Sequence, residues 1–273
     1  MKKFLLFATV ALTGMSAMAQ SQQIRVFSHR GGRMEHDENT IQAFEASHKA
    51  GYTGYETDIR MTKDGQLIVT HDSKLDRTTN GSGAVERKTL KEIQSFDTKK
   101  GNKIMTIDEL MSFLKDKKGL YVEFEMKTAP VDLYPEDRLT EYVDKLYNKV
   151  MASKPADAEF LFTSSDVRAL RKMKERHPDS ELLLIVNEPL NRENIYLAQS
   201  LNINRIGAKM GGTTRDIVKN AHDKGIIVSL WPGQSIGDFM LGAYLGADYL
   251  CTDIPIQQMN WQKKNAPYLN VKY

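Results

Sequence analysis

Three short stretches in the first half of the chain carry side chains that could transfer protons or hold a cation. His29 and Arg30 end a short apolar run, and His71 stands at the end of another. Imidazole is the side chain best suited to proton transfer near neutrality, so the two histidines are candidates for a general acid and a general base. Glu56 and Asp58 stand two residues apart, so on a strand both carboxylates point to the same side. Together these residues indicate an active site.

The carboxylate pair of Glu56 and Asp58 favours a metal site. Two acids this close raise each other's pKa, and the arrangement is costly unless a cation lies between them. Carboxylate oxygens are hard ligands that suit Mg²⁺ or Ca²⁺, so we expect one divalent ion of either kind. The alternative for this pair alone is a strand edge with solvated charges.

A second group of charges follows between Tyr121 and Lys127. Its apolar residues alternate with Glu123, Glu125 and Lys127, so on a strand the three charges share one face. In a barrel strand the apolar face would meet the helices and the charged face would point to the barrel axis. Unpaired charge is expensive there, so three inward charges near a strand end favour a functional site over a buried ionic structure without function.

The elements that must position these residues alternate regularly along the chain, which predicts an α/β fold with a parallel sheet. We expect strands over 24–28, 55–59, 120–126, 159–162, 181–186, 203–207, 226–230 and 249–251. We expect helices over 40–50, 89–95, 107–115, 139–152, 165–176, 192–200, 214–224 and 236–246. About eight strands in ~250 residues are typical of a TIM (β/α)8 barrel. An open doubly wound sheet is the alternative.

Three segments depart from this alternation. Residues 66–70 are expected to pair with the second strand across the turn at Asp64-Gly65. The segment from Asp72 to Met105 is long for a connection from a strand to a helix, and we interpret it as a small excursion over the barrel mouth. The polar tail from Asn260 to Tyr273 is expected to pack on the outside.

Residues 1–19 have the pattern of a secretory signal. Two lysines precede an apolar core over 4–12, and Ala17-Met18-Ala19 forms a cleavage site. The apolar run is shorter than the ~20 residues that span a bilayer. We therefore expect export to the periplasm or the medium, and a single domain over residues 20–273 without an integral membrane segment.

Charge and cysteine content restrict the class of protein. The chain has 38 lysine and arginine residues against 35 aspartate and glutamate residues. Without the two lysines of the signal, 36 − 35 leaves a net charge of +1, which argues against nucleic acid or an anionic membrane as the main partner. Cys251 is the only cysteine, so the fold must be held by its core without an internal disulfide.

The order of the motifs resembles the glycerophosphodiester phosphodiesterase family, whose fold is the TIM barrel of the phospholipase C-like phosphodiesterases. The matching pieces are His29-Arg30-Gly31, Glu38-Asn39-Thr40, Glu56-Thr57-Asp58, Asp64-Gly65, His71-Asp72 and the stretch from Leu75 to Gly83. Ordered matches over about 55 residues are far more specific than a lone glycine motif. The family usually has proline before its Glu-Asn-Thr, and Asp37 stands here instead.

The resemblance implies a role for each candidate residue. His29 and His71 are then the catalytic pair, with His29 favoured as base and His71 as acid. Arg30 and Lys127 are then cations that contact the phosphate, a role for which guanidinium is well suited. The implied ligands of the divalent metal are Glu56, Asp58 and Glu125.

Three further residues have less definite roles. Trp231 stands in a stretch similar to the family's Trp-Thr-x-Asn, where it could wall the alcohol side of the substrate or belong to the core. Asp253, in the closing Thr-Asp-x-Pro motif, is interpreted as structural. Glu123 stands where the family commonly has a neutral polar residue, and it could be a ligand, an acid beside the ligands, or a partner of Lys127.

The resemblance implies metal-dependent hydrolysis of a small glycerophosphodiester to sn-glycerol 3-phosphate and an alcohol. The leaving alcohol has no sequence code, so choline, ethanolamine, inositol, glycerol and a polymer end remain alternatives. A lyase of the same superfamily that stops at a cyclic phosphate is the nearest enzymatic alternative. A non-catalytic protein that binds phosphodiesters is the alternative from a different class, although a binder needs no pair of histidines for proton transfer.

Overall fold

The computed structural model describes residues 23–273, so the expected signal over residues 1–19 lies outside the described residues. Ten strands form one sheet. They are β1 (Ile24–His29), β2 (Gly54–Met61), β3 (Leu67–Val69), β4 (Tyr121–Met126), β5 (Glu159–Ser164), β6 (Glu181–Pro189), β7 (Arg205–Lys209), β8 (Ile227–Gly233), β9 (Tyr249–Thr252) and β10 (Val271–Lys272). Their order is β10-β1-β9-β8-β7-β6-β5-β4-β2-β3, and a further pairing of β1 with β2 closes the sheet on itself.

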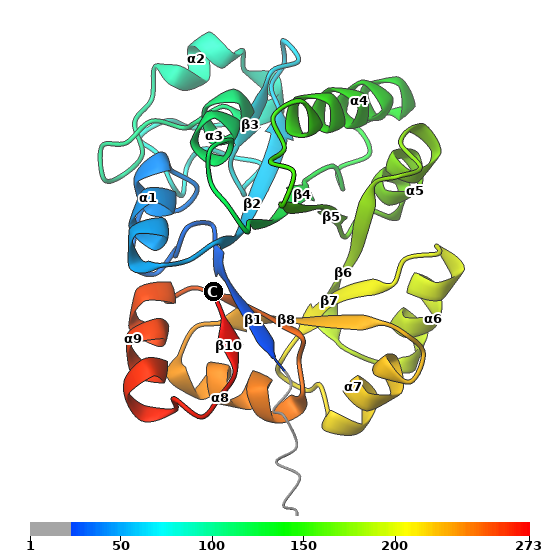
Figure 1. Cartoon of the computed structure of the whole chain (residues 1–273). Coiled ribbons are helices and arrows are strands. Elements are labelled where there is room, and N and C mark those ends of the chain that lie inside the picture. Colours follow the sequence, from blue (N-terminus) through cyan, green and yellow to red (C-terminus); the bar gives the residue numbers. More distant parts are fainter. Residues whose placement is uncertain (1–22) are drawn as a thin grey trace, which may run out of the picture.

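The closed part of the sheet is a parallel barrel of eight strands, as predicted. Figure 1 shows these strands around a common centre with the helices on the outside. Two short strands extend the barrel, because β3 pairs antiparallel with β2 and β10 pairs parallel with β1. The pairing of the first two barrel strands rules out the open doubly wound sheet.

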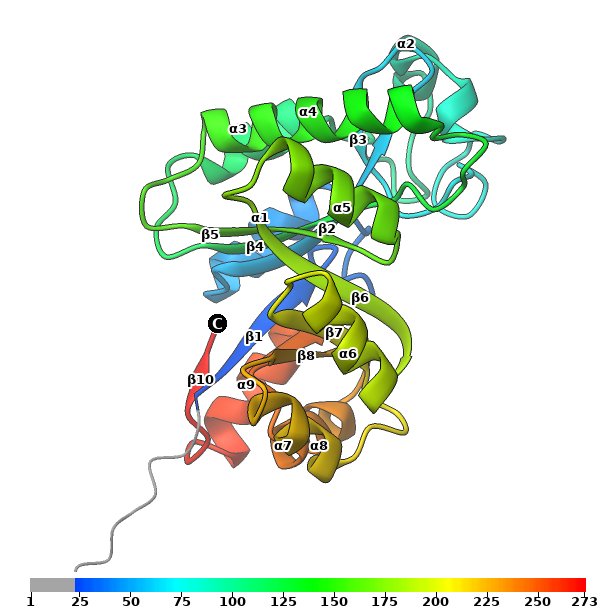
Figure 2. The same cartoon turned by 90° about the vertical axis from the view of Figure 1, so that its right-hand side faces the viewer.

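The helices alternate with the barrel strands and cover the outer face of the barrel (Figures 1 and 2). They are α1 (Ile41–Ala50), α2 (Leu90–Gln94), α3 (Ile107–Leu114), α4 (Glu136–Ala152), α5 (Val167–Arg176), α6 (Arg192–Ser200), α7 (Arg215–His222), α8 (Ile236–Leu245) and α9 (Pro255–Asn265). Thr40 caps α1 by accepting a hydrogen bond from the Ala43 amide. Among residues 23–273, no helix has both the length and the apolar character that a membrane crossing requires.

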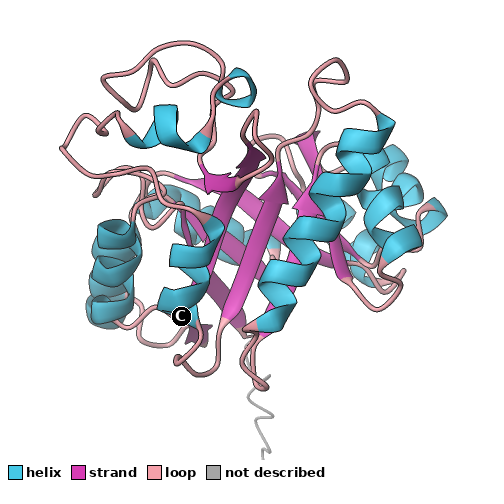
Figure 3. Ribbon diagram, turned by 90° about the horizontal axis from the view of Figure 1, so that it is seen from above, coloured by secondary structure: helices cyan, strands magenta, loops and turns pink. Residues whose placement is uncertain are grey.

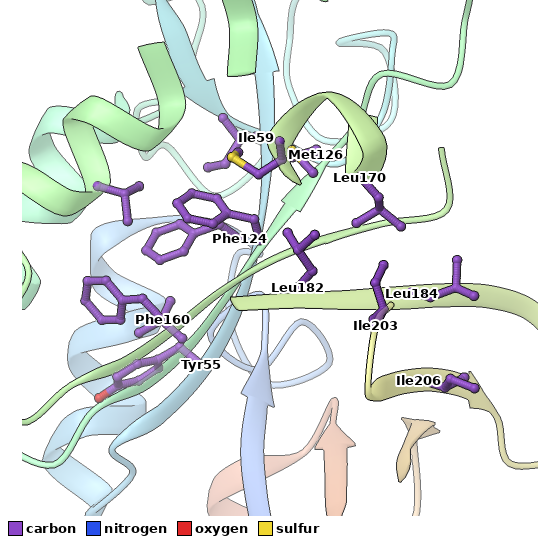
Figure 4. Close-up of a cluster of buried hydrophobic side chains, with 14 of the residues drawn as sticks. Tyr55, Ile59, Phe124, Met126, Phe160, Leu170, Leu182, Leu184, Ile203 and Ile206 are labelled. Carbon is purple, nitrogen blue, oxygen red and sulfur yellow. The ribbon is translucent and has the colours of Figure 1, made fainter. Parts of the chain in front are cut away.

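Two apolar layers hold the barrel. The larger one lies between strands and helices and contains Val122, Phe124 and Met126, the outward residues of β4. Figure 4 shows Phe124 and Met126 among the buried side chains of this layer. The smaller layer fills the barrel interior and consists of Phe27, Tyr121, Leu161, Leu183 and Cys251. Strand alternation therefore turns the charged face of β4 towards the barrel axis, as predicted.

The excursion after β3 has an apolar cluster of its own and is tied to the first loop of the barrel. A short 3-10 helix, η1 (Val85–Arg87), and α2 lie within it, beyond the end of the barrel strands (Figure 3). Asp37 accepts hydrogen bonds from the side chains of Thr98 and Asn102. The aspartate that replaces the family's proline thus anchors the excursion to the connection between β1 and α1. The cluster itself is Ile68, Leu75, Val85, Ile93 and Ile104.

The end of the chain differs from the expectation, because it contains a helix and a strand that the sequence pattern did not reveal. α9 runs into the first part of the segment that was expected to pack on the outside, over residues 260–265, and β10 adds to the barrel beside β1. The helix was missed because two of its buried positions are glutamines, Gln258 and Gln262. They are satisfied by hydrogen bonds, for example from the Tyr52 hydroxyl to Gln258 at 2.7 Å. An apolar stripe is therefore absent from the sequence.

Candidate active site

The predicted site residues other than Asp58 line one pocket at the carboxyl end of the barrel strands, and Asp58 is buried beside it. Its volume is about 550 Å³, counting the open space at its mouth. One side is charged, and the other side, from β6 and β8, is formed by Leu183, Ile185 and Trp231. Trp231 therefore faces the pocket rather than the outer core. The charged side consists of His29, Arg30, Glu56, His71, Glu125 and Lys127.

The strand register brings the acids together. In the parallel pairing of β2 with β4, Glu56 is level with Glu123, and Asp58 is level with Glu125. The pairing of β1 with β2 places His29 level with Glu56. Four carboxylates therefore form a block beside a histidine, inside a barrel where charge is costly.

The acidic block fits a divalent cation. Glu56, Asp58 and Glu125 each offer an oxygen, and these oxygens lie within 4.8 Å of one another. Both side-chain oxygens of Glu56 and Oδ1 of Asp58 are buried and have no hydrogen-bond partner among the described residues. A buried carboxylate oxygen without a partner costs free energy, so the donor set is suited to a hard ion.

The pKa values of Glu56 and Asp58 are shifted in opposite directions. Burial, and then the charge of Asp58, raise the pKa of Glu56 well above its usual range. Burial opposes the ionisation of Asp58 too, but Arg30 and Lys127 outweigh it and hold the pKa of Asp58 well below its usual range. Like-charged neighbours cannot all ionise in a buried site without a balancing cation.

His29 is held by an acid that we had interpreted as structural. Asp253 follows β9 and accepts a hydrogen bond from Nδ1 of His29 at 2.5 Å, and Nε of Arg33 lies 2.7 Å from its other oxygen. Asp253 therefore has its structural role at the site itself, because it fixes the orientation of the His29 ring. Because an ionised carboxylate only accepts, Nδ1 carries the proton and Nε2 presents its lone pair, 3.6 Å from Glu56. Burial, and then the charge of Arg30, lower the pKa of His29.

His71 has a similar partner. Its Nδ1 lies 2.7 Å from Oδ1 of Asp72, and Arg77 bonds both oxygens of that aspartate. Arg77 also donates two hydrogen bonds to Glu38, at 2.7 and 2.8 Å. Arg77 thus links the excursion to the first loop. Burial, and then the charges of Lys127 and Arg30, lower the pKa of His71.

Arg30 and Lys127 are the two cations of the pocket. Arg30 has a φ of 54°, in the left-handed region that side chains rarely adopt. Two backbone hydrogen bonds hold it there, from its amide to the Glu56 carbonyl and from the Asn39 amide to its own carbonyl. Nε of Arg30 lies 3.1 Å from Asp58, and Nζ of Lys127 lies 2.8 Å from Glu125. Such backbone strain is often found at functional sites.

Glu123 lies beneath these groups and contacts neither cation. Its Oε1 accepts a hydrogen bond from the Tyr121 hydroxyl at 2.5 Å, and burial raises the pKa of Glu123 to about 7. Of the roles that the sequence left open for Glu123, a pairing with Lys127 is therefore not observed among the described residues. Glu123 is an acid beside the ligand cluster, one of the three roles that the sequence left open.

Sequence reasoning missed two partners. Asn39, which belongs to the Glu38-Asn39-Thr40 motif, donates a hydrogen bond to Asp58 at 2.8 Å. The position of Asp253 beside His29 could have been predicted, because the last strand of a closed barrel lies beside the first strand. β1 and β9 pair with Ser28 level with Thr252, so the residue after Thr252 stands beside the residue after Ser28.

The sequence is similar to those of known phosphodiesterases. The sequence matches the glycerophosphoryl diester phosphodiesterase family over residues 29–257. A glycerophosphodiester phosphodiesterase of Caldanaerobacter subterraneus is 30% identical over 250 residues, which are 88% of this chain and 98% of that protein. A second one, of Bacillus altitudinis, is 27% identical over 246 residues, which are 85% and 95% of the two chains.

Solved structures share the fold. A phosphodiesterase from Oleispira antarctica in complex with the product sn-glycerol-3-phosphate has a TM-score of 0.79 at 20% identity, covering 88% of this chain and 97% of that one. A glycerophosphodiester phosphodiesterase from Parabacteroides distasonis has a TM-score of 0.75 at 19% identity, covering 90% and 99%. The match over most of the sequence, with 30% identity across nearly all of one relative, shows that this chain belongs to the glycerophosphoryl diester phosphodiesterase family and is a phosphodiesterase.

Proposed function

We propose that this chain hydrolyses glycerophosphodiesters to sn-glycerol 3-phosphate and an alcohol, with two histidines and one divalent cation. One observation carries the proposal. His29 and His71, each with a carboxylate at Nδ1, line the same pocket as an acidic cluster with unpartnered oxygens. The relatives named above support the substrate class, since they are glycerophosphodiester phosphodiesterases.

His29 is suited to be the general base. Asp253 fixes its tautomer, so Nε2 can accept the proton of the glycerol hydroxyl as that oxygen attacks phosphorus. The lowered pKa of His29 keeps the imidazole neutral near neutral pH. Asp253 then stabilises the imidazolium that forms, and it keeps the ring in one orientation.

His71 is suited to be the general acid. It donates its proton to the departing alcohol oxygen, and Asp72 stabilises its protonated form before the transfer. Attack by the glycerol hydroxyl gives a cyclic phosphate. Water opens this ring with the two roles reversed, and His71 then removes the proton of the water.

Arg30 and Lys127 supply fixed positive charge to the phosphoryl oxygens. Both are buried and already oriented by Asp58 and Glu125, so little reorganisation is needed as charge develops. Glu56, Asp58 and Glu125 would hold the cation, Mg²⁺ or Ca²⁺. When bound, this ion supplies a Lewis acid for a phosphoryl oxygen and for the glycerol hydroxyl.

Trp231 would lie against the leaving alcohol. It stands on the uncharged side of the pocket with Leu183 and Ile185, while Nζ of Lys209 lies 5.8 Å from the centre of its ring. The glycerol end would then bind at the acidic cluster and the alcohol end at β6 and β8.

The test measures release of glycerol 3-phosphate from a panel of glycerophosphodiesters by protein beginning at Gln20. Parallel reactions contain EDTA, Mg²⁺ or Ca²⁺, and ³¹P NMR follows any cyclic phosphate. His29→Ala and His71→Ala are compared with His222→Ala, which removes a histidine of α7 whose partner is Asp248.

We expect metal-dependent hydrolysis that both pocket variants abolish and the α7 variant keeps. A cyclic phosphate that persists would identify a lyase instead. Binding of glycerophosphodiesters without turnover, by folded protein with either metal, would identify a binding protein.

We also propose export of the protein, on the sequence pattern of residues 1–19. Recovery from the periplasm or the medium with Gln20 as the first residue is the expected result of N-terminal sequencing. Recovery from the cytosol with Met1 retained would contradict export.

A further inference from the structure

The pocket contains a second set of metal-binding side chains, and one of them, the Cys251 thiol, has no role in the proposed reaction. Cys251 is a free thiol on the inner face of β9, and it is 5% exposed. Its Sγ, a ring nitrogen of His29 and a carboxylate oxygen of Glu56 lie within 4.8 Å of one another. The three residues come from β9, β1 and β2, which are neighbours in the barrel.

This donor set has a different preference from the acidic cluster. Thiolate, imidazole and carboxylate together suit ions of the zinc class, whereas Mg²⁺ and Ca²⁺ prefer oxygen ligands alone. Burial, and then the charge of Glu56, raise the pKa of the Cys251 thiol. A bound ion must therefore displace the thiol proton to solvent, which a thiophilic ion does far better than Mg²⁺.

The two ligands beside the thiol are oriented for a cation. Asp253 occupies Nδ1 of His29, so Nε2 is left as the metal-binding nitrogen, an arrangement common in zinc sites. Arg33 fixes Asp253 from the other side. Glu56 is 4% exposed, and both of its oxygens lack a hydrogen-bond partner among the described residues.

We propose that Cys251, His29 and Glu56 form a site for one thiophilic divalent ion of the zinc class, and that its occupation inhibits the phosphodiesterase. Zinc bonds of 2.0–2.3 Å give a tetrahedral edge of about 3.3–3.8 Å. The three atoms, now within 4.8 Å, need to close by about 1.5 Å at most. Occupation would engage the lone pair of His29 and the carboxylate of Glu56, so hydrolysis stops.

The direct test uses Co²⁺ as a spectroscopic substitute for Zn²⁺, without any substrate. Thiolate bound to Co²⁺ gives a charge-transfer absorption, and Cys251 is the only cysteine of the chain, so the source of the band is unambiguous. We expect a band that saturates at about one ion per chain and that Zn²⁺ removes. Cys251→Ser should abolish it, while circular dichroism checks that the variant is folded.

Two further variants test the other ligands. Asp253→Asn removes the hydrogen bond that orients His29 and should weaken Co²⁺ binding by about 10–100-fold. His29→Gln removes the ligand itself, so its effect should be at least as large. His36→Gln is the matched control, since His36 is a histidine of the first loop outside the pocket. Absence of the band in wild-type protein, or an affinity that His29→Gln leaves unchanged, would overturn the proposal.

Inhibition is measured separately, in saturating Mg²⁺ or Ca²⁺, as loss of turnover on Zn²⁺ addition relative to each protein without Zn²⁺. The Zn²⁺ concentration that inhibits wild-type protein should be at least about tenfold lower than the concentration that inhibits Cys251→Ser. Equal inhibition of both proteins would refute the regulatory part. The absorption experiment does not depend on turnover, so its outcome is independent of whether the proposed hydrolysis is correct.

Discussion

Replacing Glu123 with glutamine should stabilise the folded protein at alkaline pH. Glu123 is 4% exposed, and its one hydrogen bond to a side chain comes from the Tyr121 hydroxyl. Glutamine has the same shape and can accept the same hydrogen bond through its amide oxygen. The substitution therefore removes the ionisable group and little else.

The magnitude follows from the pKa of Glu123, which burial raises from 4.5 to about 7. Because the folded chain holds a proton that the unfolded chain releases, this carboxyl stabilises the fold at low pH. That contribution is complete below pH 4.5 and is lost as the pH rises to about 7. At ~1.4 kcal/mol for each tenfold change in acidity, the loss is about 3 kcal/mol.

Guanidinium unfolding of wild type and Glu123→Gln in EDTA, at about pH 5 and about pH 8, measures this loss. The variant should gain about 2–3 kcal/mol over wild type between the two conditions. Glu181→Gln, which removes an exposed carboxylate at the start of β6, is the matched control. A difference between variant and wild type that does not change with pH would refute the assignment of a protonated, buried Glu123.

Three further outcomes are expected. His29→Gln and His71→Gln should each lower kcat by about 10²–10⁴-fold with an unchanged thermal midpoint, and normal turnover by either variant would exclude its histidine from proton transfer. The acid limb of the pH profile of kcat/KM should lie below 6.5, the ordinary pKa of histidine, because burial lowers the pKa of His29. Asp253→Asn should move this limb to a still lower pH, and a limb above pH 6.5 would contradict the assignment. Removing the divalent ion with EDTA should lower the free energy of unfolding by about 3 kcal/mol if the ion was present at 100 times its Kd. The same treatment should have little effect on Asp58→Asn, and an equal loss in both proteins would show that the ion binds elsewhere.

The charged residues of β4, together with Lys127 just after it, show what the alternation of side chains along a strand can predict and what it cannot. The order of residues in β4 is enough to predict that Glu125 and Lys127 point into the barrel, because side chains alternate along any strand. The same rule cannot say which neighbour each charge meets. Glu123 bonds to Tyr121 on its own strand, whereas Lys127 reaches both Glu125 and Asp58. Those choices depend on side-chain conformations set by packing, and no sequence spacing encodes them.

Contacts between distant parts of the chain were the least predictable. Asp253 lies 224 residues from His29, and only closure of the barrel brings them together. Glu38 and Arg77 are 39 residues apart and meet because the excursion folds back over the first loop. Asp253 belongs to the closing Thr-Asp-x-Pro motif and Arg77 to the matching stretch from Leu75 to Gly83, and neither motif reveals which residue its side chain contacts. These contacts could therefore be identified only from the topology of the folded barrel.

The interior of the barrel explains why a cation should matter to stability as well as to the reaction. Its floor is aromatic, with Tyr121 stacked on Tyr249 at 4.7 Å and Phe27 against Tyr121 at 5.3 Å. These rings leave little room for water beneath the acids, and in such an environment electrostatic interactions are stronger than in solvent. Among the described residues, the two oxygens of Glu56 have no hydrogen-bond partner and Oδ1 of Asp58 has only the Lys127 ammonium at 3.4 Å, so these carboxylates destabilise the ion-free fold. The same free energy is recovered when a cation binds, so the arrangement that weakens the empty barrel is the one that gives the site its affinity.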